Sequence, residues 1–184
     1  ARRVASSADA TVTLLRLVGA EHLPEEVVEA VRAIDYSSAS LKINLALSEV
    51  PSFTALPGSA PGPQHRGTIH VCPGLDYLEV AFADARAGRP SASPILECTI
   101  PSAVDPSLAP PGRHVLQMFV QYAPYRLSEG SWDDRKEAFA DRCVDLLEEY
   151  APGFRRTIRG RQVLSPLDLE RRFGLTGGNI FQGA

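Results

Sequence analysis

The strictest constraint on the fold is a short stretch in which apolar and polar residues alternate without a break. Its apolar positions are Leu41, Ile43, Leu45 and Leu47, and its other positions are Lys42, Asn44, Ala46 and Ser48. A period of two residues sends alternate side chains to opposite faces of a strand. The pattern therefore predicts a half-buried strand over 41–48, in a sheet whose two faces differ in chemistry.

The remaining patterns predict further strands and helices. Strands are expected at 1–7, 68–72, 95–100, 114–122 and 157–164, and the run at 114–122 is the most hydrophobic and therefore central. Helices are expected at 9–18, 24–34, 75–87, 133–150 and 165–173, while the proline- and glycine-rich residues 51–66 predict a loop. This order predicts an α+β fold, in which helices cover one face of a mainly antiparallel (mixed) sheet of about five strands.

Helices on one face leave the other face of the sheet to a different role. That second face would carry Lys42 and Asn44 from one strand, and Gln117, Phe119 and Gln121 from another. Long polar side chains among aromatic ones can form the roof of a ligand cavity, or can simply meet solvent. The residues alone favour solvent, because antiparallel sheets commonly expose one face to water.

Composition and charge exclude several classes of protein. The 184 residues are enough for one well-packed domain, and the net charge of −3 argues against a nucleic-acid-binding surface. No run approaches the roughly 18 apolar residues of a membrane span. Cys72, Cys98 and Cys143 form no CxxC pair, which favours a reducing compartment and no metal site. The bias toward Arg, Ala, Pro and Gly is typical of GC-rich genomes, so we expect a bacterial, cytoplasmic protein.

The chain lacks the signatures of hydrolytic enzymes. No serine lies in a Gly-x-Ser-x-Gly motif, and the spacing of the 4 histidines marks none of them as a catalytic base. Catalytic residues are therefore unassigned. The acidic helix expected at 133–150 is typical of a solvated surface, although a homo-oligomer contact there remains open.

The last twenty residues combine a well-marked short helix with a flexible turn. Ser165 suits the N-cap, Pro166 the first turn and Gly174 the left-handed stop of that helix. The following Gly177-Gly178-Asn179 leaves backbone N–H groups uncovered, so a ligand or another backbone segment can approach closely. The run is either a tight turn or a site beside a bound cofactor.

Several motifs, in order along nearly the whole chain, resemble those of the phytoene desaturase-like FAD oxidoreductases. The most specific is the run SPLDLERRFGLTGGNIFQG at 165–183. The others are LPEE at 23–26, KIN at 42–44, PSF at 51–53, IPS at 100–102, DPSLAPPG at 105–112 and YAPGF at 150–154. Together they are more specific than any one of them.

The resemblance implies a two-domain flavoprotein of which this chain is mainly the substrate domain. Residues 1–20 would belong to the junction with the FAD domain, 21–164 would form the substrate-binding domain, and 165–184 would lead back toward the FAD domain that the chain lacks. No GxGxxG follows a predicted strand. We therefore expect FAD in the intact protein and none bound to this chain alone.

The function implied by the resemblance is oxidation of a hydrophobic substrate by hydride transfer to flavin, which asks little of side chains beyond orientation. The cofactor-binding candidates are Gly177, Gly178 and Asn179, and the substrate-binding candidates are Lys42, Asn44, Gln117 and Tyr122. The alternative is a non-catalytic ligand-binding or protein-interaction domain with an apolar pocket, in which 51–66 would be a lid or a docking segment.

Overall fold

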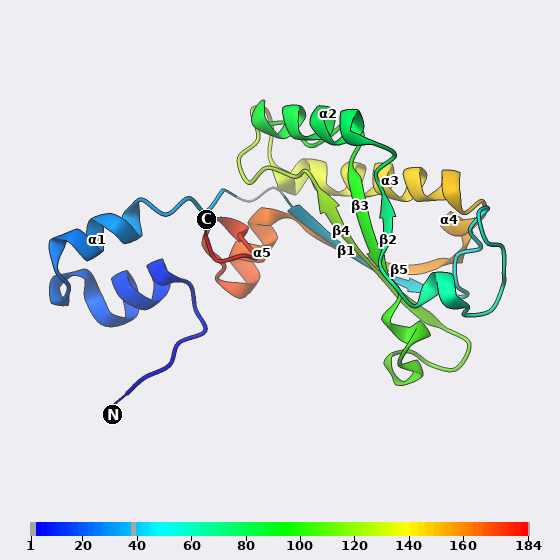
Figure 1. Ribbon diagram of the computed structural model, residues 1–184, viewed down its shortest axis with the longest axis horizontal. Helices are drawn as coiled ribbons and strands as arrows, with labels where there is room; N and C mark the ends of the chain where they lie inside the picture. The colour runs from blue at the N-terminus through cyan, green and yellow to red at the C-terminus, as the bar shows by residue number, and fades with distance from the viewer. Residues whose placement is uncertain (1–2, 38–39, 184) are drawn as a thin grey trace.

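The computed structural model describes residues 3–37 and 40–183, and its centre is a five-stranded sheet in the order β2-β3-β4-β1-β5 (Figure 1). The strands are β1 (Ser40–Leu47), β2 (Ile69–Val71), β3 (Ile95–Thr99), β4 (His114–Gln121) and β5 (Ile158–Leu164). Every neighbouring pair is antiparallel. The predicted α+β class is confirmed, and the most hydrophobic run forms the central strand β4.

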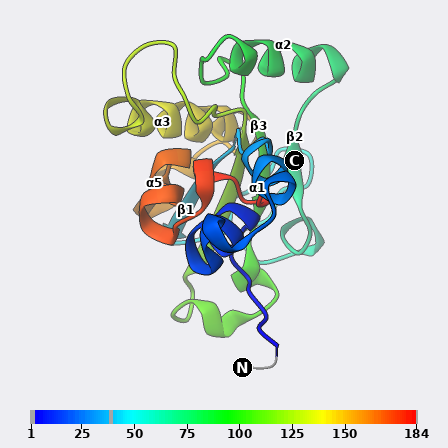
Figure 2. The ribbon, with the colours of Figure 1, turned by 90° about the vertical axis from the view of Figure 1, so that its left-hand side faces the viewer.

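Helices gather on one side of this sheet. The α-helices are α1 (Glu25–Arg32), α2 (Leu75–Arg86), α3 (Trp132–Tyr150), α4 (Phe154–Thr157) and α5 (Pro166–Phe173). In Figure 1, α2 and α3 both lie above the sheet, on the same side of it. The N-terminal helical segment lies well to one side of the sheet there, and Figure 2 looks at the molecule from that side.

The core lies between α3 and the apolar face of β1 and β4. Its members from the strands are Leu41, Ile43, Leu45, Leu47, Leu116, Met118 and Val120, and those from α3 are Trp132, Phe139, Cys143, Val144 and Leu147. The strand residues are the alternate positions that the sequence pattern marks as apolar. We call this side of the sheet the covered face.

Three local predictions differ from the structure. Residues 3–8 form no strand, and the following helical segment Thr11–Gly19 (η1) is a π-helix with no buried residue. In the sequence, Tyr150 continues the apolar spacing of Phe139, Cys143 and Leu147 and is therefore expected in the core, but α3 ends there and its side chain remains 38% exposed. The predicted loop 51–66 contains one short helical turn at Pro63–His65 (η3), where the His65 ring is fully buried.

The terminal helix α5 begins and ends at the residues that the sequence predicts. The Asp168 backbone N–H donates to Ser165 Oγ (3.1 Å), and the Ser165 backbone N–H donates to the Asp168 carboxylate (3.0 Å). These reciprocal bonds satisfy donors that a helix N-terminus leaves unpaired. Gly174 ends the helix with φ of 70°, a backbone conformation that glycine adopts at low energy.

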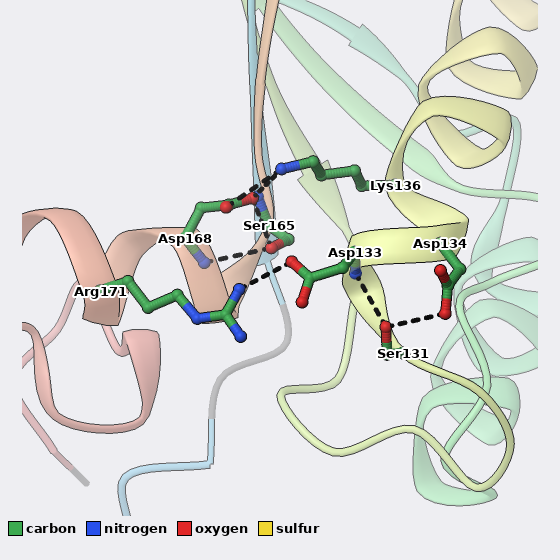
Figure 3. A network of polar contacts seen from close by, with 7 residues as sticks. All are labelled: Ser131, Asp133, Asp134, Lys136, Ser165, Asp168 and Arg171. Atoms are coloured by element: carbon green, nitrogen blue, oxygen red, sulfur yellow. Dashed lines mark hydrogen bonds and ion pairs between the residues drawn. The ribbon is translucent and has the colours of Figure 1, made fainter.

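Two ion pairs hold α5 against the first turns of α3 (Figure 3). Lys136 Nζ lies 2.9 Å from the Asp168 carboxylate, and Arg171 Nη1 lies 2.7 Å from that of Asp133. The first pair is less exposed than the second, so water screens it less. The ion pairs fix the direction in which the chain leaves the sheet.

Candidate functional site

The polar positions of the central strands share the face of the sheet turned away from α3. Lys42 lies opposite Phe119 of β4 and Leu164 of β5, while Asn44 lies opposite Gln117 and Gln162. We call this side the open face, and its polar and aromatic side chains include Lys42, Asn44, Glu97, Thr99, Gln117, Phe119, Gln121 and Gln162. All of them are at least partly exposed. The predicted second face of the sheet is confirmed.

Lys42 is the most unusual residue of the open face. Its Nζ donates to Gln117 Oε1 at 2.8 Å, and its neighbours across the strands, Phe119 and Leu164, are apolar. Partial burial lowers the pKa of Lys42 below its ordinary value, since desolvation disfavours the charged form. Among the described residues no carboxylate lies within 4.0 Å of this ammonium group. It is a half-buried cation with one neutral partner.

A second polar pair lies next to Lys42 on the open face. Asn44 Nδ2 donates to Gln162 Oε1 at 3.1 Å. Sequence reasoning did not single out Gln162, because β5 carries no alternating pattern strong enough to show which of its residues would reach this face. Lys42, Asn44 and Gln117 are thus brought together as predicted, and Gln162 joins them.

Tyr122 is not brought together with the other three substrate-binding candidates. It follows the last residue of β4, and its ring packs against Phe82 of α2 with centroids 5.3 Å apart. Its backbone N–H donates to Ser91 Oγ at 3.1 Å. Both contacts lie on the helix side of the sheet, so Tyr122 helps to attach α2 and does not border the open face.

A hollow of about 600 Å³ lies beyond the end of the sheet at which β1 begins and β4 and β5 end. Three strands converge there, because 34–37 precede β1, 124–126 follow β4, and α5 follows β5. We call it the end hollow, and its lining comprises 34–37, 124–126, Glu170 and 176–177. It lies between the Gly-Gly turn and the end of the sheet.

Glu170 organises the end hollow. One carboxylate oxygen accepts a hydrogen bond from the Gly177 backbone N–H at 2.8 Å, and the other accepts one from the Tyr125 hydroxyl. The bond to Glu170 and burial together raise the pKa of Tyr125. Sequence reasoning missed this group, because Tyr125 and Glu170 lie 45 residues apart and Tyr125 belongs to no recognisable motif.

The Gly-Gly turn is glycine-rich because other parts of the chain press against it. A Cβ on Gly177 (φ 61°) would lie 2.5 Å from the Tyr36 carbonyl oxygen, and one on Gly178 (φ 63°) would lie 2.0 Å from the Pro166 carbonyl oxygen. The structure therefore shows a close approach of backbone segments at this turn, while a role beside a cofactor stays a prediction. Gly177 also lines the end hollow, whereas Gly178 is buried.

Asn179 is occupied by the turn itself. Its Oδ1 accepts from the Phe181 backbone N–H at 2.8 Å, and its Nδ2 donates to the Ser37 carbonyl oxygen at 3.3 Å. The side chain is buried. Of the three predicted cofactor-binding residues, Gly177 is therefore the one placed to touch a ligand in the end hollow.

Two classes of site are not formed by the described parts of the chain. Within 3–37 and 40–183, no group of three or more His, Cys, Asp or Glu side chains is arranged to hold a metal ion. None of the helices described in these ranges has both the length and the apolar character needed to cross a membrane.

The fold and site define a class of domain: an α+β layer that buries one sheet face under helices and leaves the other, polar and aromatic, partly exposed. No protein-family model matches the chain. The whole chain is 47% identical to part of the rat protein named pyridine nucleotide-disulfide oxidoreductase domain-containing protein 2, and 46% identical to its mouse counterpart. Phytoene dehydrogenase of Streptomyces griseus is 29% identical over 116 residues, which are 56% of this chain and 23% of that protein.

The predicted resemblance is confirmed: the rodent proteins match the whole chain, and the weaker match to phytoene dehydrogenase covers 56% of it. The chain spans about a third of the rodent proteins, 32% of each. Their mammalian source gives no support to the predicted bacterial origin, and the cytoplasmic location and a homo-oligomer both stay predictions.

Proposed function

We propose that this chain is the substrate domain of an FAD-dependent oxidoreductase, which oxidises a hydrophobic substrate by hydride transfer to flavin. The observation that carries the proposal is the open face, where a half-buried Lys42 has a neutral amide as its partner. A sheet face that only meets solvent does not require a partly desolvated cation. A face that forms a wall beside a redox cofactor and its substrate does require one.

The residues present fit one wall of a flavin site and do not fit the cradle of its pyrophosphate. The open face offers an ammonium group, carboxamides and an aromatic ring, which suit a polar, planar ring system and an apolar substrate. A dinucleotide cradle instead needs a glycine-rich turn between a strand and a helix. The described turn at 176–178 has a different setting, since it follows α5 and packs on Pro166.

The roles of this chain's residues follow from that position. FAD, when bound, would supply the hydride acceptor. Lys42 would hold a positive charge in a partly desolvated place, where it stabilises negative charge more strongly than in water. Phe119 would contact the apolar part of the substrate, and Gln117 would keep the Lys42 side chain oriented.

The two ends of the described chain meet beside the end hollow, which supports their assignment to the junction between domains. The Thr176 backbone N–H donates to Asp9 Oδ2 at 3.4 Å, and Gln182 Nε2 donates to the Ser7 carbonyl oxygen at 3.3 Å. Burial alone would raise the pKa of Asp9, but hydrogen bonds from Val12 and Thr176 lower it. We place Gly177 next to the cofactor at this junction.

The test compares two lysine variants in the full-length gene product that contains this chain. Lys42→Met should slow flavin reduction by substrate at least about tenfold while flavin content stays unchanged. Lys136→Met removes the same charge in the ion pair with Asp168 and should leave the rate of reduction within about twofold. A full-length product purified without flavin, or equal rates for both variants, would contradict the proposal.

The chain itself provides a second test. Because it lacks the pyrophosphate cradle, we expect the 184 residues alone to be purified without bound flavin. A purified sample that is yellow, with one flavin per chain, would show that the cofactor assignment to another domain is wrong.

A non-catalytic ligand-binding domain is the second candidate, and one observation favours it. An apolar hollow of about 310 Å³ is lined by residues of the 51–66 segment, of β2 and of the end of α3. Phe53, Leu56, Ile69, Val71 and Tyr150 line it. Mass spectrometry of molecules extracted from the full-length product separates the candidates, since a retained apolar compound without flavin favours binding alone.

A further inference from the structure

A hollow of about 410 Å³ lies on the helix side of the sheet, opposite the open face, between the end of α2 and the first half of α3. Its lining consists of Asp84, Arg89, Pro90, Ala92, Arg135, Ala138, Phe139 and Arg142. We call it the arginine hollow. The function proposed above makes no use of it.

The α3 wall of the arginine hollow is a single stripe of the helix. Arg135, Ala138, Phe139 and Arg142 are spaced i, i+3, i+4 and i+7, which places them on one face. Seven residues of α-helix rise about 10 Å, so the two arginines leave α3 about two turns apart. Between them the small Ala138 leaves room, and Phe139 forms an apolar floor.

The positive charge in this hollow exceeds the negative charge. Asp84 is the one acidic residue of the lining, and it is already occupied by Arg89 Nη2 at 2.8 Å and by the Ala92 backbone N–H at 2.9 Å. Arg135 reaches only Glu129, at 3.8 Å, whose side chain is 84% exposed. In the part of the chain that the structure describes, no carboxylate lies within 4.0 Å of the Arg142 guanidinium.

A backbone hydrogen bond joins two segments that lie beside the arginine hollow. The Ser128 backbone N–H donates to the Gly88 carbonyl oxygen at 2.8 Å, which joins the end of α2 to the loop before α3. A Cβ on Gly88 (φ +72°) would lie 2.9 Å from the Ser128 nitrogen, and one on Gly130 would lie 2.8 Å from Arg135 Nε. Both glycines allow this close packing.

We propose that the arginine hollow binds an organic phosphate. The guanidinium groups of Arg135 and Arg142 hold the phosphate oxygens, because their planar fork of donors matches phosphate geometry. Pro90, Ala138 and Phe139 contact the organic body of the ligand. The volume lies within the range of small-molecule sites.

The site is tested by titrating the full 184-residue chain with ADP and with inorganic pyrophosphate in a calorimeter. ADP should bind, and it should bind more tightly than pyrophosphate because only ADP has a body for the apolar floor. The double variant Arg135→Ala/Arg142→Ala should lose at least about tenfold in affinity for ADP. The double lysine variant should retain part of it, because lysine keeps the charge but not the fork.

Arg159→Ala is the matched control, since Arg159 is an exposed arginine of β5 outside this hollow. It should leave the affinity for ADP within about twofold. Circular dichroism and thermal unfolding of each variant establish that it is folded. Absence of ADP binding to the wild type, an unchanged affinity in the folded double alanine variant, equal affinity for ADP and pyrophosphate, or an equal loss in Arg159→Ala would overturn the proposal.

Discussion

The covered face and the open face are built from the same strands, yet they contribute differently to the molecule. On β4, Leu116 is fully buried under the helices, while the next residue, Gln117, reaches the other side and holds Lys42. Burial of apolar side chains provides most of the stability of a fold. Alternate residues of one strand can therefore differ in purpose: those on the covered face stabilise the fold, and those on the open face are available for the proposed function. Substitutions on either face can test this.

The largest expected effect is on the covered face. Leu116→Ala should lower the free energy of unfolding by about 2–5 kcal/mol, because it leaves a cavity in a packed core. Gln117→Ala, one residue away, should lower it by less than about 1 kcal/mol. Urea denaturation followed by circular dichroism measures both. Similar losses for the two variants would mean that the faces do not differ as proposed.

Substitutions at two glycines, Gly178 and Gly174, test whether close packing of the Gly-Gly turn contributes to stability. Gly178→Ala should destabilise the chain by about 2–3 kcal/mol, since the new Cβ would meet the Pro166 carbonyl oxygen and the backbone is left-handed. Gly174→Ala has the same backbone strain but open space around it, so we expect about 1 kcal/mol. Thermal unfolding compares them, and an equal loss would remove the packing argument.

The ion pair between α3 and α5 links the covered side to the end hollow. Asp168→Asn should cost about 1–2 kcal/mol at neutral pH, because it weakens both the cap and the pair with Lys136. Burial alone would raise the pKa of Asp168, but bonds from Ser165 and Lys136 lower it below 3.8.

A carboxyl group whose pKa is lowered by folding stabilises the native state above its unfolded pKa and loses this effect as the pH falls through the folded value. The difference in stability between wild type and Asp168→Asn should therefore be constant near neutrality and shrink below about pH 4. Urea denaturation across pH measures it. A difference that grows on acidification would contradict the assigned direction. Asp133→Asn, in the more exposed pair, is the control and should show a smaller difference throughout.

The smallest expected change in stability is at Lys42. Lys42→Met should leave the free energy of unfolding at pH 7 within about 1 kcal/mol or raise it, because it removes a partly desolvated charge. Folding lowers the pKa of Lys42, so the wild type should gain stability relative to the variant as the pH rises through the folded value toward 10.5. Chemical denaturation from pH 7 to 10 would show this. A clear loss at pH 7 would assign Lys42 a structural role.

Local patterns predicted much of this fold, since they report directly on burial. The alternation around Ile43 identified a strand and both of its faces, and Ser165 and Gly174 marked the ends of α5. Their signals lie within a few residues of each other. The open face followed from the same alternation, including Lys42, Asn44 and Gln117.

Contacts between distant segments could not be predicted in this way. The bond between Tyr125 and Glu170 depends on how two loops meet at the end of the sheet, and Tyr122 turned to Phe82 because α2 passes over that end. The arginine hollow likewise needs α2 and α3 side by side. Periodicity shows which side of an element is apolar, but it does not show what will pack against it.

The outer strands of the sheet also influence whether the protein associates with further copies of itself. A strand with unpaired backbone groups can recruit another chain and begin a fibre. Here β2 has only 3 residues, and β5 carries Arg161, which pairs with Asp141 and Glu137 of α3. A short strand on one edge of the sheet and a charged strand on the other therefore discourage pairing with the edge of another chain.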